Sequence, residues 1–229
     1  MSWAGRGGRA GGSGGSGESG ESGESGESGE SGEFVESGAS GRVAAAMAAQ
    51  PRDRFLPRSQ RRRAGYDGPL DIGHGQTNSQ PRTVRAMLEL LDVRPGQRVL
   101  DVGSGSGWTT AILAELVGPT GSVLGVELVP ELVRTGAGNV TAAGVPWARV
   151  RQADPGVLGA PDDGPFDRVL VSAMAATLPV ELVDQLGPHG ILVVPVHGWM
   201  LRVERDDEAP DGVVVTRHGA YAFVPLITG

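Results

Sequence analysis

Three glycines at alternate positions, Gly103, Gly105 and Gly107, follow a short apolar run in the middle of the chain. A glycine loop that ends a buried strand and opens a helix is where doubly wound sheets bind nucleotides, because no Cβ keeps the ligand away from the backbone. The spacing departs from the G-x-G-x-x-G pattern of dinucleotide sites, since the third glycine comes one place early. Asp101 stands two residues before the first glycine. A carboxylate there suits an ammonium group of the ligand and not a pyrophosphate.

Two further acids end the next two apolar runs. Glu127 lies 20 residues after Gly107, where a carboxylate can accept hydrogen bonds from both ribose hydroxyls. Asp154 follows the third run, and an acid there can accept from an adenine amino group. The predicted ligand therefore carries a cationic amino end and an adenine nucleoside, a combination that S-adenosylmethionine provides. The alternatives are a plain glycine turn and ordinary surface acids.

The elements that must position these residues alternate between strand and helix patterns from Arg98 onward. The predicted strands are Arg98–Val102, Ser122–Glu127, Ala148–Ala153, Asp167–Ala173 and Ile191–Val196. The predicted helices are Thr109–Val117, Pro130–Ala143 and Pro179–Leu186. This alternation predicts an α/β fold with a doubly wound, mostly parallel sheet and helices on both faces. Three strand-like segments without helices between them, Leu201–Arg205, Val213–Arg217 and Ala220–Leu226, predict an antiparallel C-terminal end.

Residues 1–41 differ from the rest of the chain in composition. They contain 15 of the 38 glycines and a Glu-Ser-Gly repeat over residues 17–33. Gly, Ser and Glu cannot bury enough apolar area to offset chain entropy, so we predict a disordered tail. The alternative is an acidic segment that docks on the arginine-rich residues 42–63. The predicted domain spans residues 42–229, with an N-terminal helical segment at 42–97 and the ligand-binding sheet at 98–229.

The formal net charge of −7 is unevenly distributed. Residues 1–41 carry −5, residues 42–63 carry +6 and residues 64–229 carry −8. An acidic main domain argues against a nucleic-acid partner. The run Arg61–Arg63 lacks interleaved aromatic residues, so we predict a solvated turn there. A short helix over Val43–Ala49 should end before Pro51.

Several classes of protein are disfavoured by what the sequence lacks. The absence of cysteine excludes disulfides and thiolate chemistry, and the scattered histidines predict no metal site. No apolar run has the length of a membrane span or the pattern of a secretion signal, which favours a cytoplasmic protein. No heptad repeat is present, and we expect a monomer.

The segment Pro69-Leu-Asp-Ile-Gly-His-Gly-Gln-Thr-Asn-Ser-Gln-Pro81 resembles the signature of the protein-L-isoaspartate O-methyltransferases. The loop at 101–108, with Glu127 and Asp154, resembles the cofactor motifs of class I S-adenosylmethionine-dependent methyltransferases. Three other stretches agree with the family in the same order: Pro51–Phe55, Gly164–Arg168 and Phe223–Leu226. The resemblance covers roughly residues 43–229, and Gly-Gln-Thr-x-Ser-x-Pro ahead of a glycine loop is its most specific part.

This resemblance implies that S-adenosylmethionine binds in the Asp101–Gly107 loop. It implies methylation of the free carboxylate of L-isoaspartyl residues in proteins or peptides, followed by succinimide formation and repair. Thr77 and Ser79 would lie beside the transferred methyl, with Ser79 as the active-site hydroxyl and residues 42–97 on the acceptor side. The alternative role of Ser79 is to cap the helix that begins near Arg82. His74 is predicted to pack or hydrogen-bond and not to act as a base, since a carboxylate with a pKa of ~4 is already ionised at neutral pH.

The chain departs from the family pattern chiefly on the acceptor side. His74 stands where the family often has an aromatic residue, and Asn78 stands where it often has a hydrophobic one. Trp108 replaces a frequent tyrosine, and residues 153–155 read Ala-Asp-Pro in place of Gly-Asp-Gly. A branch of the family methylates an aspartate of a dedicated natural-product peptide and yields an aspartimide, which is the first alternative function. A regulator without catalysis is disfavoured by four residues that catalysis would use: Thr77, Ser79, Asp101 and Glu127. A nicotinamide dehydrogenase is disfavoured by the loop spacing.

Overall fold

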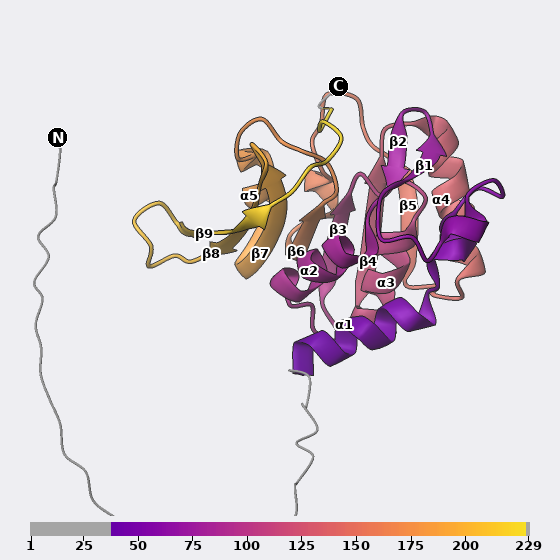
Figure 1. The fold of residues 1–229 in the computed structure, drawn as a ribbon. Helices are drawn as coiled ribbons and strands as arrows, with labels where there is room; N and C mark the ends of the chain where they lie inside the picture. The colour runs from indigo at the N-terminus through magenta and orange to yellow at the C-terminus, as the bar shows by residue number, and fades with distance from the viewer. Residues whose placement is uncertain (1–37, 228–229) are drawn as a thin grey trace, which may run out of the picture. The chain divides into compact units, whose positions relative to one another are not determined.

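The computed structural model describes residues 38–227, with a seven-stranded sheet at the centre (Figure 1). The strand order is β5-β4-β3-β6-β7-β8-β9. The strands are β3 (Arg98–Val102), β4 (Ser122–Glu127), β5 (Ala148–Gln152), β6 (Phe166–Val171), β7 (Leu186–Val196), β8 (Trp199–Arg205) and β9 (Val213–Ala220). The first five in this order pair in parallel, whereas β8 pairs antiparallel with both β7 and β9. The predicted sheet, mostly parallel with an antiparallel C-terminal end, is confirmed.

The topology brings two strand ends together near the middle of the sheet. The chain enters at β3, moves outward through β4 to β5 and then returns to the other side of β3 as β6. Val102, the last residue of β3, pairs in register with Val126, one residue before the end of β4. In open α/β sheets, ligands bind outside such carboxyl ends where the strand order reverses. The glycine loop after β3 and Glu127 at the end of β4 therefore lie at one edge.

Helices cover the two faces of the sheet unequally. On one face pack α1 (Gly38–Ala49), α2 (Pro81–Leu91), α3 (Trp108–Val117) and α4 (Pro130–Ala142). Their buried side chains form one core with alternate strand residues such as Val99, Val123 and Leu170. The other face is covered by the short helix α5 (Val180–Val183) and by residues of the β5–β6 connection, including Ala160. Helices on both faces were the prediction, and the structure places nearly all helical residues on one of them.

Helix α1 includes the predicted helix over Val43–Ala49 and ends before Pro51 as expected. It begins at Gly38, so the predicted domain boundary between residues 41 and 42 falls within its first turn. Ser40 Oγ donates to Glu89 Oε1 at 2.6 Å, which ties this turn to α2. The predicted tail over residues 1–37 lies outside the described residues and stays a prediction. Within the described range, no helix has the length and apolarity needed to cross a membrane.

Two predicted C-terminal elements differ from the structure. The predicted helix Pro179–Leu186 is shortened to α5, and β7 starts five residues before the predicted Ile191, because Gly187, Pro188 and Gly190 do not continue a helix. The predicted strand Ala220–Leu226 is wrong, since β9 ends at Ala220 and the following residues leave the edge of the sheet. They run beside Met174 instead, whose N–H donates to the Val224 carbonyl at 2.7 Å.

A small hairpin carries the segment ahead of α2. Its strands β1 (Leu70–Gly73) and β2 (Gln76–Asn78) are joined by His74 and Gly75, with φ of 57° and 72°. Positive φ at both loop residues is what a type I′ hairpin requires. Three short 3₁₀ helices complete the described elements: η1 (Arg52–Phe55), η2 (Arg61–Arg63) and η3 (Pro161–Asp163). The arginines of η2 are exposed, as expected for a solvated turn.

Candidate active site

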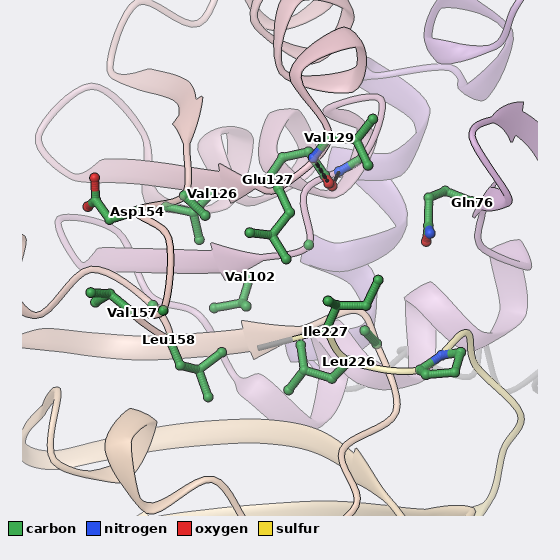
Figure 2. Close-up of a pocket in the computed structure, with 18 of the residues that line it drawn as sticks. Gln76, Val102, Val126, Glu127, Val129, Asp154, Val157, Leu158, Leu226 and Ile227 are labelled. Atoms are coloured by element: carbon green, nitrogen blue, oxygen red, sulfur yellow. Dashed lines mark hydrogen bonds between the residues drawn. The ribbon is translucent and has the colours of Figure 1, made fainter. Parts of the chain in front are cut away.

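A cavity of about 770 Å³, including space open to solvent, lies at the carboxyl ends of the central strands (Figure 2). Figure 2 shows Glu127 and the apolar ends of β3 and β4 on one side, with Leu226 and Ile227 of the C-terminal segment nearby. Asp154, after β5, stands at the far end of the same cavity. Ile72 and Gln76 contribute from the hairpin. Its place at the carboxyl ends of parallel strands is where α/β sheets bind small-molecule ligands.

The three loop glycines have two different roles. Gly103 and Gly105, with φ of 77° and 53°, line the cavity. A Cβ at Gly103 would meet no atom within 4 Å, so the missing side chain leaves room for a ligand. Gly107 does not line the cavity, and a Cβ there would lie 2.9 Å from the Gly136 carbonyl oxygen of α4. The structure thus places Gly107 where α3 packs on α4, and its predicted contact with the cofactor stays a prediction.

Glu127 lies where the sequence predicts it, in the wall of the cavity. Only 8% of the residue is exposed. Its Oε2 accepts from the Gly105 N–H at 2.9 Å and its Oε1 from the Val129 N–H at 3.0 Å. Each carboxylate oxygen has a further lone pair, so the group can still accept from ligand hydroxyls. The two backbone bonds fix its direction and tie the glycine loop to the end of β4.

Asp101 lies beneath the loop and is fully buried. Its Oδ2 accepts from the hydroxyls of Thr109 (2.8 Å) and Thr110 (2.7 Å) at the start of α3. Burial raises the pKa of the Asp101 carboxyl to about 6, although the hydrogen bonds from Thr110 and Thr109 oppose the shift. Its Oδ1 has no partner among the described residues. Asp101 does not line the cavity that contains Glu127, nor the second cavity described below. The predicted bond between Asp101 and an ammonium group therefore stays a prediction.

Asp154 lines the cavity and is largely exposed. Its Oδ2 accepts from Arg151 Nη1 at 3.0 Å. Arg151 also pairs with Asp163 through Nη2, at 3.2 Å. The arginine therefore orients Asp154 and leaves its other oxygen unoccupied by the described residues, as an acceptor for an adenine amino group requires.

A second, smaller cavity of about 290 Å³, again including space open to solvent, lies next to the first. Its side chains are neutral, and most carry hydroxyl or amide groups: Thr77, Asn78, Ser79, Ser104, Ser106, Trp108, Thr109 and Ser172. Ser104 Oγ is buried without a partner among residues 38–227. Thr77, Gly103 and Gly105 line both cavities. The two spaces therefore share a wall formed by these three residues, and the hydroxyl-rich one can hold a carboxylate through neutral donors.

Ser79 lines this second cavity and is half-buried. Helix α2 begins at Pro81 with Gln80 as its N-cap residue. The capping role considered for Ser79 is therefore wrong. Its Oγ makes no hydrogen bond to another described residue, whereas its carbonyl oxygen accepts from Arg52. The hydroxyl is free to donate to a ligand.

The histidines do not form a site in the described part of the chain. His74 is exposed at the hairpin tip and lines neither cavity. No group of three or more His, Cys, Asp or Glu side chains among residues 38–227 is arranged to hold a metal ion.

Ser104, Ser172 and the C-terminal residues Leu226 and Ile227 are site residues that sequence reasoning missed. Ser104 stands between two glycines of the loop, and Ser172 directly follows β6. Residues at the carboxyl ends of parallel strands are candidates by position alone, which was the signal available for Ser172. The contribution of Leu226 and Ile227 follows from the backbone pairing of residues 224–226 with Met174, for which the sequence has no local signal.

The residues present fit S-adenosylmethionine. The glycine loop leaves a cradle at Gly103, buried Glu127 can accept from a ribose, and Asp154 in the cavity wall has a carboxylate oxygen that no described residue occupies. Together with the strand order and the antiparallel end of the sheet, this site defines a class I S-adenosylmethionine-dependent methyltransferase. The family model for protein-L-isoaspartate (D-aspartate) O-methyltransferase matches residues 33–229, and the chain belongs to that family.

Relatives and solved structures agree with this membership. The chain is 45% identical over 195 residues to the protein-L-isoaspartate O-methyltransferase of Methanopyrus kandleri, covering 82% of this chain and 84% of the relative. It is 44% identical to that of Aeropyrum pernix, with 82% and 73% covered. A crystal structure from Plasmodium falciparum, described as a protein-L-isoaspartate O-methyltransferase in complex with S-adenosyl-L-homocysteine, superposes with a TM-score of 0.71 at 27% identity, covering 82% of this chain and 91% of that one.

Proposed function

We propose that this chain transfers a methyl group from S-adenosylmethionine to the free carboxylate of L-isoaspartyl residues in proteins or peptides. The observation that carries the proposal is that two neighbouring cavities share Thr77, Gly103 and Gly105 in their walls. One has the carboxylates and apolar walls that suit a nucleoside, and the other has neutral donors that suit a carboxylate. Membership of the family, with relatives above 40% identity over most of their length, supports this acceptor.

The cofactor side of the proposal assigns a separate role to each residue. S-adenosylmethionine supplies a methyl group on a positively charged sulfur, from which a nucleophile in line can displace it. Glu127 accepts from the ribose hydroxyls and Asp154 from the adenine amino group. Gly103 and Gly105 let the backbone lie against the ligand. Asp101 holds the first turn of α3 through Thr109 and Thr110.

The acceptor side of the site has to align the acceptor carboxylate with the methyl group and does not have to activate it. An ordinary carboxylate is ionised at neutral pH, so no general base is needed. Holding two reactants in an attack geometry can contribute ~7–11 kcal/mol. Ser79 donates a hydrogen bond to the oxygen that does not attack, and Thr77 lines both cavities. Because these donors are neutral, they orient the carboxylate without removing the charge that makes it a nucleophile.

The methyl ester then reacts without further help from the protein. The backbone nitrogen of the next residue attacks the ester carbonyl, methanol leaves and a succinimide ring closes. Methanol is a better leaving group than the hydroxide that the free acid would lose. Hydrolysis of the succinimide returns part of the product to normal aspartate, which completes the repair.

The proposal includes a monomeric, cytoplasmic enzyme whose partner is a protein or peptide and not a nucleic acid. The acidic balance of residues 64–229, with a net charge of −8, supports the exclusion of nucleic acid. Light scattering at working concentration tests the oligomeric state, and a dimer mass would contradict this part of the proposal.

The test is methyl transfer from radiolabelled S-adenosylmethionine to a matched peptide pair. One peptide contains L-isoaspartate and its control contains normal aspartate at the same position. We expect label only in the isoaspartyl peptide, because a misplacement of about 1 Å of the attacking oxygen costs ~100-fold. Mass spectrometry should then detect the succinimide. Methylation of neither linear peptide, together with methylation of a cross-linked natural-product peptide, would replace repair with the dedicated-peptide function.

A further inference from the structure

Arg52, in the 3₁₀ helix η1, is buried against the ends of the β1–β2 hairpin, with 5% of the residue exposed. Its Nη2 donates to the carbonyl oxygens of Ser79 (2.9 Å), Asn78 (2.9 Å) and Gly68 (2.8 Å). Its Nε donates to Asn78 Oδ1 at 2.6 Å, and its Nη1 donates to the Tyr66 carbonyl at 2.8 Å. One guanidinium thus binds the chain before the first strand and after the second strand of the hairpin. This hairpin carries Thr77, and Ser79 directly follows it.

The same side chain reaches the cofactor side. The guanidinium carbon lies 5.5 Å from the centroid of the Trp108 ring, the first residue of α3. Asn78, which Arg52 orients, donates from Nδ2 to Ser106 Oγ of the glycine loop at 3.2 Å. Arg52 therefore connects the segment of Ser79 to the loop that closes the cofactor cavity.

All hydrogen-bond partners of Arg52 are neutral, and no carboxylate in residues 38–227 pairs with it. Burial lowers its pKa to about 10, while Asp67 raises it, so the group stays protonated at neutral pH. A buried cation without an ion-pair partner needs every donor satisfied to be tolerated. Only a planar guanidinium has five donors in a fixed fork, and a lysine has neither the number nor the geometry.

We propose that Arg52 is a positioning residue for methyl transfer: it fixes Ser79 against the glycine loop so that the acceptor carboxylate meets the methyl group in line. This inference rests on the proposed function. Arg52 lines neither cavity and touches Ser79 only through its carbonyl oxygen. It therefore sets the geometry without bonding to the attacking oxygen, which a direct arginine contact would make a weaker nucleophile.

Arg52→Lys tests the proposal, because it keeps the charge and removes the fork. We expect kcat on the isoaspartyl peptide to fall ~100-fold, as for a displacement of about 1 Å, while the Kd of S-adenosylhomocysteine changes less than threefold. The matched control is Arg168→Lys. Arg168 is also buried and bonds to backbone carbonyls. It lies near the amino ends of the strands, where it is the register partner of Val99, whereas both cavities lie at the carboxyl ends. Its variant should lose thermal stability and keep kcat.

A second readout does not depend on the acceptor. Amide hydrogen exchange of the segment 70–80 should be at least tenfold faster in Arg52→Lys than in wild type, and unchanged in Arg168→Lys. Full turnover in Arg52→Lys, or equal losses of kcat in both variants, would overturn the proposal, as would unchanged exchange. If wild type fails on isoaspartyl peptide, the proposed function fails, and the exchange measurement still decides whether Arg52 holds the segment.

Asn78→Ala keeps the inference testable if Arg52→Lys does not fold. It removes one Arg52 contact and the bond to Ser106 but leaves the bond to the Ser79 carbonyl. We expect a several-fold fall in kcat and faster exchange of the same segment, with S-adenosylhomocysteine affinity within threefold. A variant with wild-type exchange and wild-type kcat would contradict the proposal.

Discussion

The carboxylate of Asp101 is wholly buried, and its two oxygens have unlike surroundings. Oδ2 accepts from two threonine hydroxyls, whereas Oδ1 has no partner in the part of the chain that the structure describes. Desolvation favours the protonated form and raises the pKa from 3.8 to about 6. The native protein therefore binds this proton more tightly than the unfolded chain does, and the contribution of Asp101 to stability declines as pH rises from 4 to 6.

Asp101→Asn should remove that pH dependence. One pKa unit corresponds to ~1.4 kcal/mol, so the free energy of unfolding of the variant relative to wild type should rise by up to ~3 kcal/mol between pH 4 and pH 7. Urea unfolding at several pH values measures this difference. A constant difference across the range would contradict a raised pKa for Asp101.

Glu127→Gln should weaken cofactor binding. The amide keeps one oxygen and places an NH₂ opposite a backbone N–H, either that of Gly105 or that of Val129. On the proposed assignment of Glu127, it also leaves a ribose hydroxyl without its acceptor. We expect a loss of ~1–3 kcal/mol, or about five- to 150-fold in the Kd of S-adenosylhomocysteine by calorimetry. Glu131→Gln is the control, since Glu131 is exposed and lies outside the cavity; equal effects of the two changes would rule out the assignment.

Ser79→Ala should lower turnover and change little else. The hydroxyl has no partner among the described residues and the helix cap is Gln80, so neither the melting temperature nor cofactor affinity should move. Loss of one orienting hydrogen bond predicts a fall of ten- to a hundredfold in kcat. Turnover, melting temperature and Kd are measured on one preparation. A lower melting temperature with intact turnover would restore a structural role.

The sequence predicted which residues lie near the site better than it predicted which face of the sheet each side chain points to. Spacing after the predicted strands identified Glu127 and Asp154 as cavity residues. Asp101 alternates with Val102 along β3, so it shares a face with Val99 beneath the helices while Val102 lines the cavity. That alternation was visible in the sequence, but a strand buried on both faces shows no polar pattern to reveal which face a ligand occupies.

At the scale of elements, the bounds of β3 and β4 agree with the prediction because each is a short apolar run in the middle of the sheet. The prediction fails where the pairing partner decides the structure. Residues 220–226 have strand composition, but Pro225 offers no N–H and Met174 supplies the partner instead of an edge of the sheet. The extension of β7 back to Leu186 depends on an irregular pairing with Phe166. Such long-range pairings leave no local signal.

The different roles of the loop glycines predict different variant behaviour. Gly103→Ala places a methyl group in open space beside the cavity, whereas Gly107→Ala forces Cβ to 2.9 Å from the Gly136 carbonyl. The first should weaken S-adenosylhomocysteine binding at least tenfold with a modest fall in melting temperature. The second should lower the melting temperature more.

Gly144→Ala is the control for strain alone in this comparison. Its φ of 76° is close to the 77° of Gly103, and a Cβ there also meets nothing within 4 Å. Alanine at positive φ costs ~1–2 kcal/mol wherever it occurs, so this control should lose stability without losing affinity per folded molecule. If Gly103→Ala binds the cofactor as Gly144→Ala does, the cradle assignment is wrong.

At the scale of the molecule, the site lies within one body of the chain. The lining of both cavities and all six predicted cofactor-binding residues fall between residues 72 and 227. The family model begins at residue 33, close to the start of α1. Most of the Glu-Ser-Gly repeat lies ahead of both. Composition alone predicts this division, because apolar residues capable of forming a core are scarce before residue 34.

Two truncations that differ by only four residues should therefore behave differently. Removal of residues 2–37 takes away seven glutamates and two arginines, a net charge of −5, but none of helix α1. Removal of residues 2–41 also deletes Ser40, whose hydroxyl donates to Glu89 and accepts from Arg85, and the first turn of α1. We expect removal of residues 2–37 to leave the melting temperature unchanged and to change turnover on an isoaspartyl peptide less than a few-fold. The longer one should lower the melting temperature by a few degrees, as the loss of ~1 kcal/mol does in a domain of this size. A large loss of turnover on removal of residues 2–37 would contradict the prediction that this acidic segment is dispensable for catalysis.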